Sequence, residues 1–259
     1  MAPELTLYTA SAPNGVKITA ALEFLGLPYK VVTVSLSALE QKEPWFLEIN
    51  PNGRIPALVD NTDGKDVRLM ESGAILLYLA DKYDPEHKLS FEQGSPEYYE
   101  VLEWLFWQVG GLGPMQGQCL HFLHYCVTSN PDVRGYGINR YQNETRRLFS
   151  VLETRLAKQK ETKNSKFLVG DHLSIADLAC LGWVLFDTYA GIPSEDYPLL
   201  KEWQDYVSAI PEVKKGLDTP SPFMIKEVAK SKDMTKMAAE AGAAWIKIQF
   251  EQQLKLGQK

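Results

Sequence analysis

The chain has 259 residues, of which 45% are hydrophobic, 11% aromatic and 23% charged, a composition that excludes disorder as its main state. Its 27 basic and 33 acidic residues give a net charge of −6, which disfavours nucleic acid as a partner. No apolar run reaches the ~18 residues that cross a bilayer, and the start Met1-Ala2-Pro3-Glu4 lacks the pattern of a secretory signal. We therefore expect a cytoplasmic protein with no membrane partner.

The first 83 residues alternate short apolar runs with helical patterns. They predict strands at 5–9, 29–34, 57–59 and 67–70, and helices at 15–25, 44–48 and 72–83. The opening β-α-β order implies two parallel strands with a right-handed crossover, and the turn Asn61-Thr62-Asp63-Gly64 predicts a hairpin. The order β-α-β followed by β-β-α predicts an α/β domain with a thioredoxin-like fold.

The residues after about 95 predict one helix after another. Ser95-Pro96-Glu97 opens a helix that we expect to bend or break at the glycines of 110–114 and to end near residue 127. These glycines follow a helix and lack the Lys-Ser/Thr of a nucleotide-binding loop. Further helices are predicted at about 139–160, 174–189, 198–208 and 225–256, the second opened by a capping box at Ser174 and Asp177.

A polar linker separates these two parts of the chain. We predict a thioredoxin-like domain at 1–86 and an all-α domain at 95–259, in which residues from about 218 form an extra helical tail. The side chains of Trp245, Ile248 and Phe250 are candidates to pack this tail against the body of the protein.

Cysteine and histidine residues cluster between Cys119 and Cys126. On a helical wheel Cys126 lies ~20° from Cys119, but His121 and His124 lie ~200° and ~140° from Cys119, so the four side chains cannot converge on one ion. We therefore expect no metal. The chain has three cysteines, and this odd number without a secretory signal favours reduced thiols.

The loop after the first predicted strand, residues 11–14, indicates where a reactive group would lie. In a thioredoxin-like fold it brings the reactive group to a helix N-terminus, whose free N–H groups and dipole favour a thiolate. Here the loop reads Ser11-Ala12-Pro13-Asn14 where a redox protein would carry Cys-x-x-Cys, so any reacting thiol must arrive with a ligand. We predict that Asn14 activates this thiol with its amide donors, assisted by Ser11 or by a backbone N–H.

Three other features suit a thiol peptide. A cis bond at Ile55-Pro56 would turn the Ile55 backbone outward to pair with an extended peptide. Ser72 at a helix start can hold a carboxylate, and Glu71 an ammonium group, while Gln41 and Arg54 can reach the other end. Each feature alone has a structural explanation, since Ser72 can be a helix cap and Ile-Pro a turn at a strand edge. Their joint occurrence favours the peptide site.

Five segments together form a specific pattern: 13–15, 50–57, 71–79, 104–115 and 173–177. With them the chain resembles the glutathione transferase superfamily over roughly residues 4–217, in particular the bacterial nu class and the fungal group that includes the nitrogen-catabolite regulator. The resemblance implies a homodimer with its active sites near the subunit interface. Nu-class enzymes often have threonine at the position of Ala12, which leaves the hydroxyl donor to the thiol open between Ser11 and other groups.

The resemblance also implies a role for each candidate residue. All of them are expected to contact glutathione: Asn14 beside the sulfur, Gln41 and Arg54 near the glycyl end, Ile55 against the cysteinyl backbone, Glu71 and Ser72 at the γ-glutamyl end, and Arg140 reaching glutathione in the partner subunit.

The reaction implied is activation of the glutathione thiol. The thiolate would attack a small electrophile, or reduce a disulfide or peroxide, in detoxification or in carbon–sulfur bond formation of fungal secondary metabolism. The alternative is a non-catalytic regulatory or interaction protein like the nitrogen regulator, which has a long Asn/Gln-rich N-terminal region, whereas the fold here is expected to begin within about five residues of Met1. A maleylacetoacetate isomerase would carry Ser-x-Cys in the first loop, which this sequence lacks.

Overall fold

The computed structural model describes residues 2–126, 128 and 130–256, and the side chains of residues 245 and 249–256 are outside the described part. Its first part contains one four-stranded sheet in the order β2-β1-β3-β4. β1 pairs in parallel with β2, and the pairs β1–β3 and β3–β4 are antiparallel. The strands are β1 (Leu5–Thr9), β2 (Tyr29–Thr33), β3 (Ala57–Asp60) and β4 (Val67–Met70). The predicted α/β fold of this part is confirmed.

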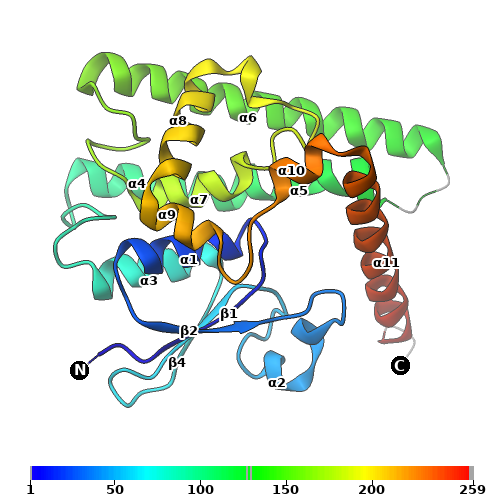
Figure 1. Cartoon of the computed structure of the whole chain (residues 1–259), viewed down its shortest axis with the longest axis horizontal. Helices are drawn as coiled ribbons and strands as arrows, with labels where there is room; N and C mark the ends of the chain where they lie inside the picture. The colour runs from blue at the N-terminus through cyan, green and yellow to red at the C-terminus, as the bar shows by residue number, and fades with distance from the viewer. Residues whose placement is uncertain (1, 127, 129, 257–259) are drawn as a thin grey trace.

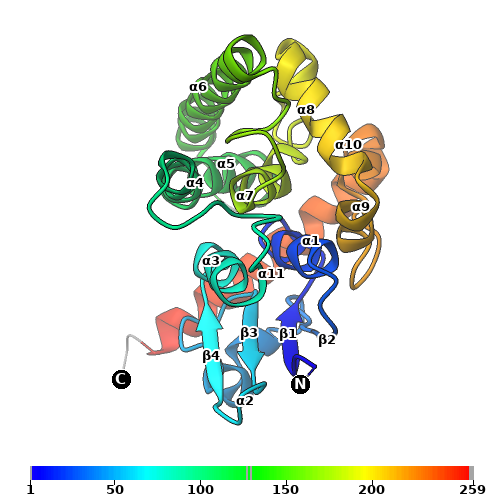
Figure 2. The ribbon, with the colours of Figure 1, turned by 90° about the vertical axis from the view of Figure 1, so that its left-hand side faces the viewer.

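Helices cover both faces of this sheet. α1 (Gly15–Phe24) and α3 (Ser72–Tyr83) lie on the face toward the helical part of the molecule, and the short α2 (Pro44–Leu47) lies on the other (Figures 1 and 2). All four residues of β3 are buried, because this central strand has covered faces and a paired neighbour on each side.

One buried carboxylate fixes the end of β3. Asp60 accepts hydrogen bonds from the hydroxyl groups of Tyr78 and Tyr83, at 2.6 Å each, and from the backbone N–H of Thr62 at 2.8 Å. Burial raises the pKa of Asp60, but these hydrogen bonds outweigh burial and hold the pKa well below its usual range. The carboxylate therefore ties α3 to the sheet.

The second part consists of helices, as predicted. They are α4 (Pro96–Trp107), α5 (Gly113–Leu120), α6 (Pro131–Lys163), α7 (Ile175–Val184), α8 (Pro198–Ala209), α9 (Pro211–Leu217), α10 (Ile225–Lys230) and α11 (Lys232–Leu256), with a 3-10 turn, η4, at Ser194–Asp196. Within the described residues, no helix is both long and apolar enough to span a membrane.

The α-helix is interrupted at the glycine-rich segment after α4, where the sequence predicts a bend or break. Gln108–Leu112 forms a π-helical turn, η2, and α5 follows it directly with Pro114 in its first turn. Proline has no N–H to donate, and it lies where the preceding π-helical turn, whose Gly113 N–H donates to the Gln108 carbonyl, has already interrupted the α-helical hydrogen-bond pattern. A second π-helical turn, η3 (His121–Tyr125), continues α5, and the predicted end near residue 127 lies outside the described residues.

α6 begins eight residues before the predicted start at 139. The Asn130 side chain caps it by accepting hydrogen bonds from the N–H groups of Asp132 and Val133, and Pro131 occupies the first helical position. Gly137 lies inside the helix, where a Cβ would meet the Phe122 ring at 2.2 Å. This glycine therefore permits close packing and does not end the helix.

Three further bounds differ from the predictions. α7 ends at Val184 instead of 189, because the chain turns where the Asp187 carboxylate accepts a 2.5 Å hydrogen bond from Ser194 Oγ. Pro211 starts α9, which the sequence patterns missed. The tail is two helices, α10 and α11, separated at Ser231. Ile248 is 42% exposed, whereas the side chains of Trp245 and Phe250 lie outside the described part.

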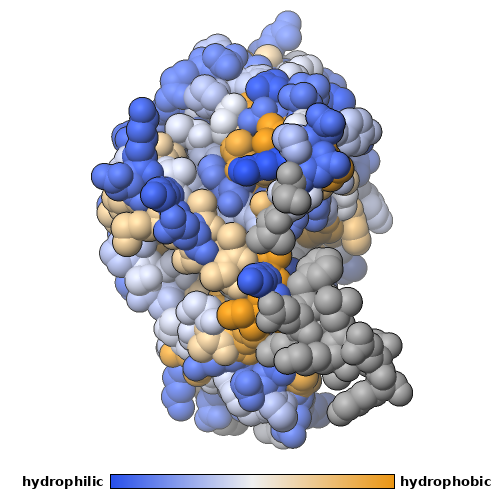
Figure 3. Space-filling view, turned by 90° about the vertical axis from the view of Figure 1, so that its right-hand side faces the viewer, coloured by the Kyte–Doolittle hydropathy of each residue, from blue (hydrophilic) through white to orange (hydrophobic). Residues whose placement is uncertain are grey.

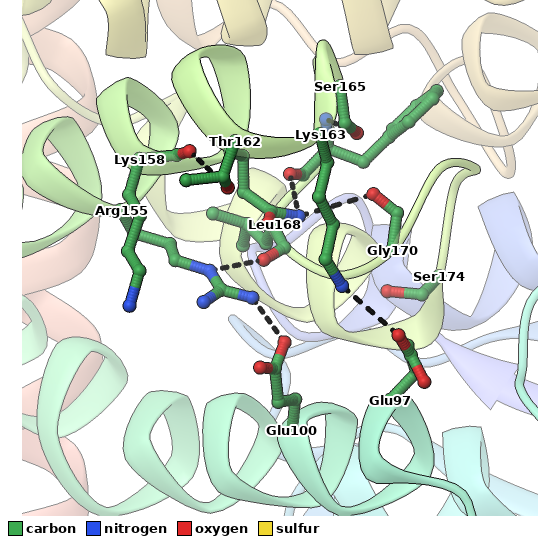
Figure 4. Close-up of polar contacts among 12 residues, drawn as sticks. Glu97, Glu100, Arg155, Lys158, Thr162, Lys163, Ser165, Leu168, Gly170 and Ser174 are labelled. Atoms are coloured by element: carbon green, nitrogen blue, oxygen red, sulfur yellow. Dashed lines mark hydrogen bonds and ion pairs between the residues drawn. The ribbon is translucent and has the colours of Figure 1, made fainter.

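Charged side chains join α6 to its neighbours (Figure 4). Arg155 pairs with Glu100 of α4 and donates to the Leu168 carbonyl at 2.6 Å. Lys163 pairs with Glu97 of α4 at 3.1 Å. These contacts attach the long α6 both to α4 and to the loop that leads into α7.

α7 lies at the centre of the helices. The predicted capping box at its start is present, and Asp177 is completely buried. One carboxylate oxygen accepts from the Leu168 N–H and from Trp203 Nε1, and the other accepts from the N–H and hydroxyl of Ser174. The far end of α7 packs against α1, which places it next to the loop after β1.

Candidate active site

Asn14 occupies the N-cap position of α1, as the last residue of the loop after β1. Its side chain does not cap the helix. Instead its Oδ1 accepts a 2.9 Å hydrogen bond from Trp183 Nε1 of α7. Because an indole N–H is only a donor, this contact fixes the amide with its carbonyl toward Trp183 and leaves its two N–H donors directed elsewhere.

Glycines allow the close contact between α7 and this loop. A Cβ at Gly182 would lie 2.2 Å from the Pro13 carbonyl oxygen, and one at Gly113 would lie 3.1 Å from Trp183 Nε1. Side chains at either position would push α7 away from the loop or displace the indole. The geometry of Asn14 is thus set by the helical part of the molecule as well as by its own loop.

The hydroxyl of Ser11 is already engaged. It donates to the Ser221 carbonyl at 2.8 Å, and the two serine hydroxyls are also 2.8 Å apart. Ser11 has one proton, so the bond between the hydroxyls must be donated by Ser221. Ser11 therefore has no donor left for a thiolate while the segment before α10 stays in place.

After Ser221 the chain continues into the tail helices α10 and α11. α11 runs along one side of the molecule, on the right in Figure 1, past both parts of the fold. Its Gly242 packs against the Tyr125 ring of η3. On the face that carries α11, apolar side chains gather across the middle of the surface (Figure 3). The tail is thus part of the surroundings of the loop that contains Ser11.

The start of α3 forms the second part of the cluster. Glu71, the N-cap residue, has a φ of 67°, a strained value for a residue with a side chain, and its carboxylate accepts from Asn52 Nδ2 at 3.3 Å. Ser72 is buried, with 7% of its surface exposed. The first N–H groups of a helix lack intrahelical partners, so this end of α3 suits a carboxylate.

The residues predicted for the opposite end of the peptide surround Gly53. Gln41 is buried, and among the described residues its side-chain nitrogen and oxygen have no hydrogen-bond partner. Arg54 is exposed, and burial together with the Arg54 charge lowers the pKa of the neighbouring Lys42. The Ile55–Pro56 bond is cis, the conformation on which the interpretation of a peptide site depends. The two neighbouring cationic side chains of Lys42 and Arg54 fit an anionic ligand end.

Contacts connect these residues into one cluster. Gly53 lies against the Gln41 backbone, the neighbouring Asn52 contacts Glu71, and Ser72 contacts a buried lysine of α1 one turn after Asn14. The structure thus links the residues predicted in the first part of the chain. Arg140 is exposed on α6, so its predicted contact with a partner subunit's glutathione stays a prediction.

Sequence patterns missed three residues of this cluster: Trp183, Lys17 and Gln108. Lys17 Nζ donates to Ser72 Oγ at 3.2 Å and to Gln108 Oε1 at 2.6 Å. The lysine within the apolar run Val16–Ala21 and the single indole N–H on apolar α7 were the available signals. Neither signal identifies its partner, because the partners lie 55 to 169 residues away.

Cys119 and His124 of the cysteine and histidine cluster contact different backbone carbonyls. Cys119 is buried and contacts the Ala190 carbonyl, and His124 Nε2 contacts the Tyr189 carbonyl at 2.7 Å. In the described ranges no group of three or more His, Cys, Asp or Glu side chains could hold a metal ion. All three cysteines are free thiols.

Comparisons with known proteins identify the two parts of the chain. Residues 3–81 match the glutathione S-transferase N-terminal domain, and residues 138–211 match the glutathione S-transferase C-terminal domain. The disulfide-bond oxidoreductase YfcG of Escherichia coli is 44% identical over 216 residues, covering 82% of this chain and 94% of the relative.

Two solved structures show the same similarity. A glutathione transferase homolog from Lodderomyces elongisporus with two glutathione molecules per subunit has 45% identity and a TM-score of 0.78, and the match covers 84% of this chain and 99% of that one. The nitrogen regulation fragment of the yeast prion protein Ure2p has 34% identity and a TM-score of 0.76, with 83% and 96% covered.

Proposed function

The chain belongs to the glutathione S-transferase family, and we propose that it binds glutathione across the Asn14–Ser72 cluster and uses the glutathione thiolate as a nucleophile. The observation that carries this proposal is the fixed amide of Asn14. Its carbonyl is held by Trp183, so its N–H donors are available at the N-terminus of α1. The unsatisfied Gln41 and the start of α3 would hold the two ends of the peptide.

The energetics support this assignment. Lowering a thiol pKa by ~2 units requires ~2.7 kcal/mol of preferential binding of the thiolate. A hydrogen bond to an ionised group contributes ~1.5 to 3 kcal/mol and a helix N-terminus ~0.3 to 2 kcal/mol. One amide donor from Asn14 and the end of α1 therefore suffice, without a hydroxyl at Ala12.

Of the possible reactions, we favour reduction of a disulfide. The glutathione thiolate attacks one sulfur of the disulfide, a mixed disulfide forms, and the other sulfur leaves as a thiolate that takes up a proton. A second glutathione then attacks the mixed disulfide, giving oxidised glutathione and the second free thiol. The similarity to an Escherichia coli disulfide-bond oxidoreductase and to a structure with two glutathiones per subunit supports this choice.

Turnover assays separate the candidate reactions. With reduced glutathione we expect turnover of hydroxyethyl disulfide to exceed that of cumene hydroperoxide and of a chloronitrobenzene. Asn14→Ala should slow the reaction and raise the thiol pKa of bound glutathione, whereas Asn143→Ala, an exposed asparagine on α6, should change neither. Conjugation of the chloronitrobenzene as the main activity would instead assign the protein to carbon–sulfur bond formation, in detoxification or in secondary metabolism.

A non-catalytic regulator is the alternative, favoured by the similarity to the nitrogen regulation fragment of Ure2p. Such a protein would bind glutathione without turnover of any of the three substrates. Calorimetry that detects no heat with reduced glutathione would refute both functions, because both place the peptide at Asn14.

We also propose that the protein acts in the cytoplasm as a homodimer in which Arg140 contacts the partner subunit's glutathione. The exposure of Arg140 on α6 is compatible with this role. Sedimentation should give twice the chain mass, and Arg140→Ala should weaken glutathione binding without altering the sedimentation. A monomer with unchanged glutathione affinity would contradict the assignment.

A further inference from the structure

A lysine is buried beneath the start of α3. Lys17 has 1% of its surface exposed, and its Nζ contacts Ser72 Oγ and Gln108 Oε1. Within the described residues it forms no ion pair with a carboxylate. An ammonium group that loses water without gaining a counter-charge is costly, so this position requires an explanation.

The hydrogen bonds of Lys17 fit a neutral amine. A neutral amine has two N–H donors, and the two contacts to Ser72 and Gln108 use both. Protonation adds a third donor, and the described residues offer it no acceptor. Burial lowers the pKa of Lys17 to about 7, although Cys180 and Glu71 oppose this shift. The free protein therefore holds the lysine close to its titration midpoint near neutral pH.

Lys17 lies close to the residues proposed for the thiol and for the γ-glutamyl end of the ligand. It follows Asn14 by three residues, so the two side chains are neighbours on α1. Its bond to Ser72 Oγ occupies a lone pair of that hydroxyl and leaves the hydroxyl proton free to be donated outward. A carboxylate at the start of α3 would then accept from Ser72 and lie near the Lys17 amine.

We propose that Lys17 is the buried counter-charge for the ligand carboxylate at Ser72, and that binding of this carboxylate draws a proton from solvent onto Lys17. The inference rests on the proposed function, because it places a γ-glutamyl carboxylate at the start of α3. An anion favours the charged form of a neighbouring amine, so binding raises the Lys17 pKa and the complex takes up a proton. No covalent bond changes in this step.

The other groups that face Lys17 do not supply this proton linkage. Cys180 of α7 is buried, and burial raises its pKa far above neutrality, so its thiol keeps its proton. Asp177 of α7 faces Cys180 and is satisfied by its own four hydrogen bonds. Glu71, before α3, is exposed, and its carboxylate would face the proposed ligand ammonium group. Gln108 of η2 does not titrate.

Calorimetry with a thiol-blocked ligand tests the inference. S-methylglutathione retains the γ-glutamyl carboxylate but releases no thiol proton on binding. Its binding heat is measured in phosphate and in Tris, whose ionisation enthalpies differ, so a difference between the heats reports the protons taken up. If binding raises the Lys17 pKa from about 7 to about 8, uptake is about 0.4 proton at pH 8 and about 0.1 at pH 6. The same shift weakens binding about fivefold from pH 6 to pH 8.

Two variants test whether Lys17 is the group that takes up the proton on ligand binding. Lys17→Met keeps a long apolar side chain and should lose this uptake and the fivefold pH dependence, leaving only the contribution of the ligand's own amino group. Lys158→Met, at an exposed lysine of α6, should behave like the wild-type protein. Should Lys17→Met fail to fold, Lys17→Leu and Lys17→Gln provide other neutral replacements for the same comparison.

The outcomes are distinguishable. Equal heats in the two buffers at pH 8, with clear binding, would overturn the role of Lys17 and leave the glutathione site standing. Uptake that persists unchanged in Lys17→Met would assign the proton to another group and equally overturn it. Absence of any binding heat in the wild-type protein would refute the proposed function instead.

Discussion

Replacing Trp183 by phenylalanine tests how the helical part of the molecule sets the chemistry of Asn14. The substitution removes the indole N–H that donates to Asn14 Oδ1 at 2.9 Å and keeps an aromatic ring in the same place. A neutral hydrogen bond of this kind contributes about 1 kcal/mol. Without it the Asn14 amide can rotate and present its carbonyl to the ligand sulfur, which disfavours a thiolate.

The expected effect follows from this magnitude. One unit of pKa corresponds to ~1.4 kcal/mol, so Trp183→Phe should raise the thiol pKa of bound glutathione by about 0.7 unit. Titration of the ultraviolet absorbance of the bound thiolate measures this value. A merely structural effect of the smaller ring would lower melting temperature or affinity but would not move the thiol pKa.

A double-mutant comparison decides the interpretation. In an Asn14→Ala background the indole has no amide to orient, so Trp183→Phe should add no further change in thiol pKa. If Trp183→Phe leaves the thiol pKa unchanged in the wild-type background, or shifts it equally in both, the orienting role of Trp183 is refuted.

Three other predictions follow from the hydrogen bonds. Ser11→Ala should change the thiol pKa of bound glutathione by less than about 0.3 unit, because the Ser11 hydroxyl is donated to Ser221. A rise as large as that of Asn14→Ala would show that Ser11 turns toward the ligand. Asp60→Asn should lower the free energy of unfolding by about 2 kcal/mol at pH 7. The folded pKa of Asp60 is depressed, so this contribution is present above the unfolded pKa of ~3.9 and is lost as pH falls below it; urea unfolding with a pH-independent difference would contradict this. Asp177→Asn should cost about 3 kcal/mol, because an amide oxygen cannot accept all four of the buried hydrogen bonds, and urea unfolding with an unchanged midpoint would disprove it.

The sequence was sufficient where structure is decided locally. The four strands and α3 were predicted closely, because alternating apolar runs, turn residues and helix caps act over a few neighbouring residues. The capping box at Ser174 and Asp177 was predicted for the same reason. α6 was underestimated, since Gly137 resembles a helix breaker until the Phe122 ring packed against it is seen.

The features of the candidate site also fall into those that the sequence identified and those that only the tertiary structure identified. The amino-acid sequence by itself determined that the first loop has no cysteine, that Asn14 stands at a helix start, and that a Glu-Ser pair opens α3. Only the tertiary structure decided which way the Asn14 amide points, which group takes the Ser11 proton, and where Lys17 finds its partners. The physical reason is that a side-chain hydrogen bond is specified by three-dimensional proximity, and these partners are separated by 55 to 210 residues of chain.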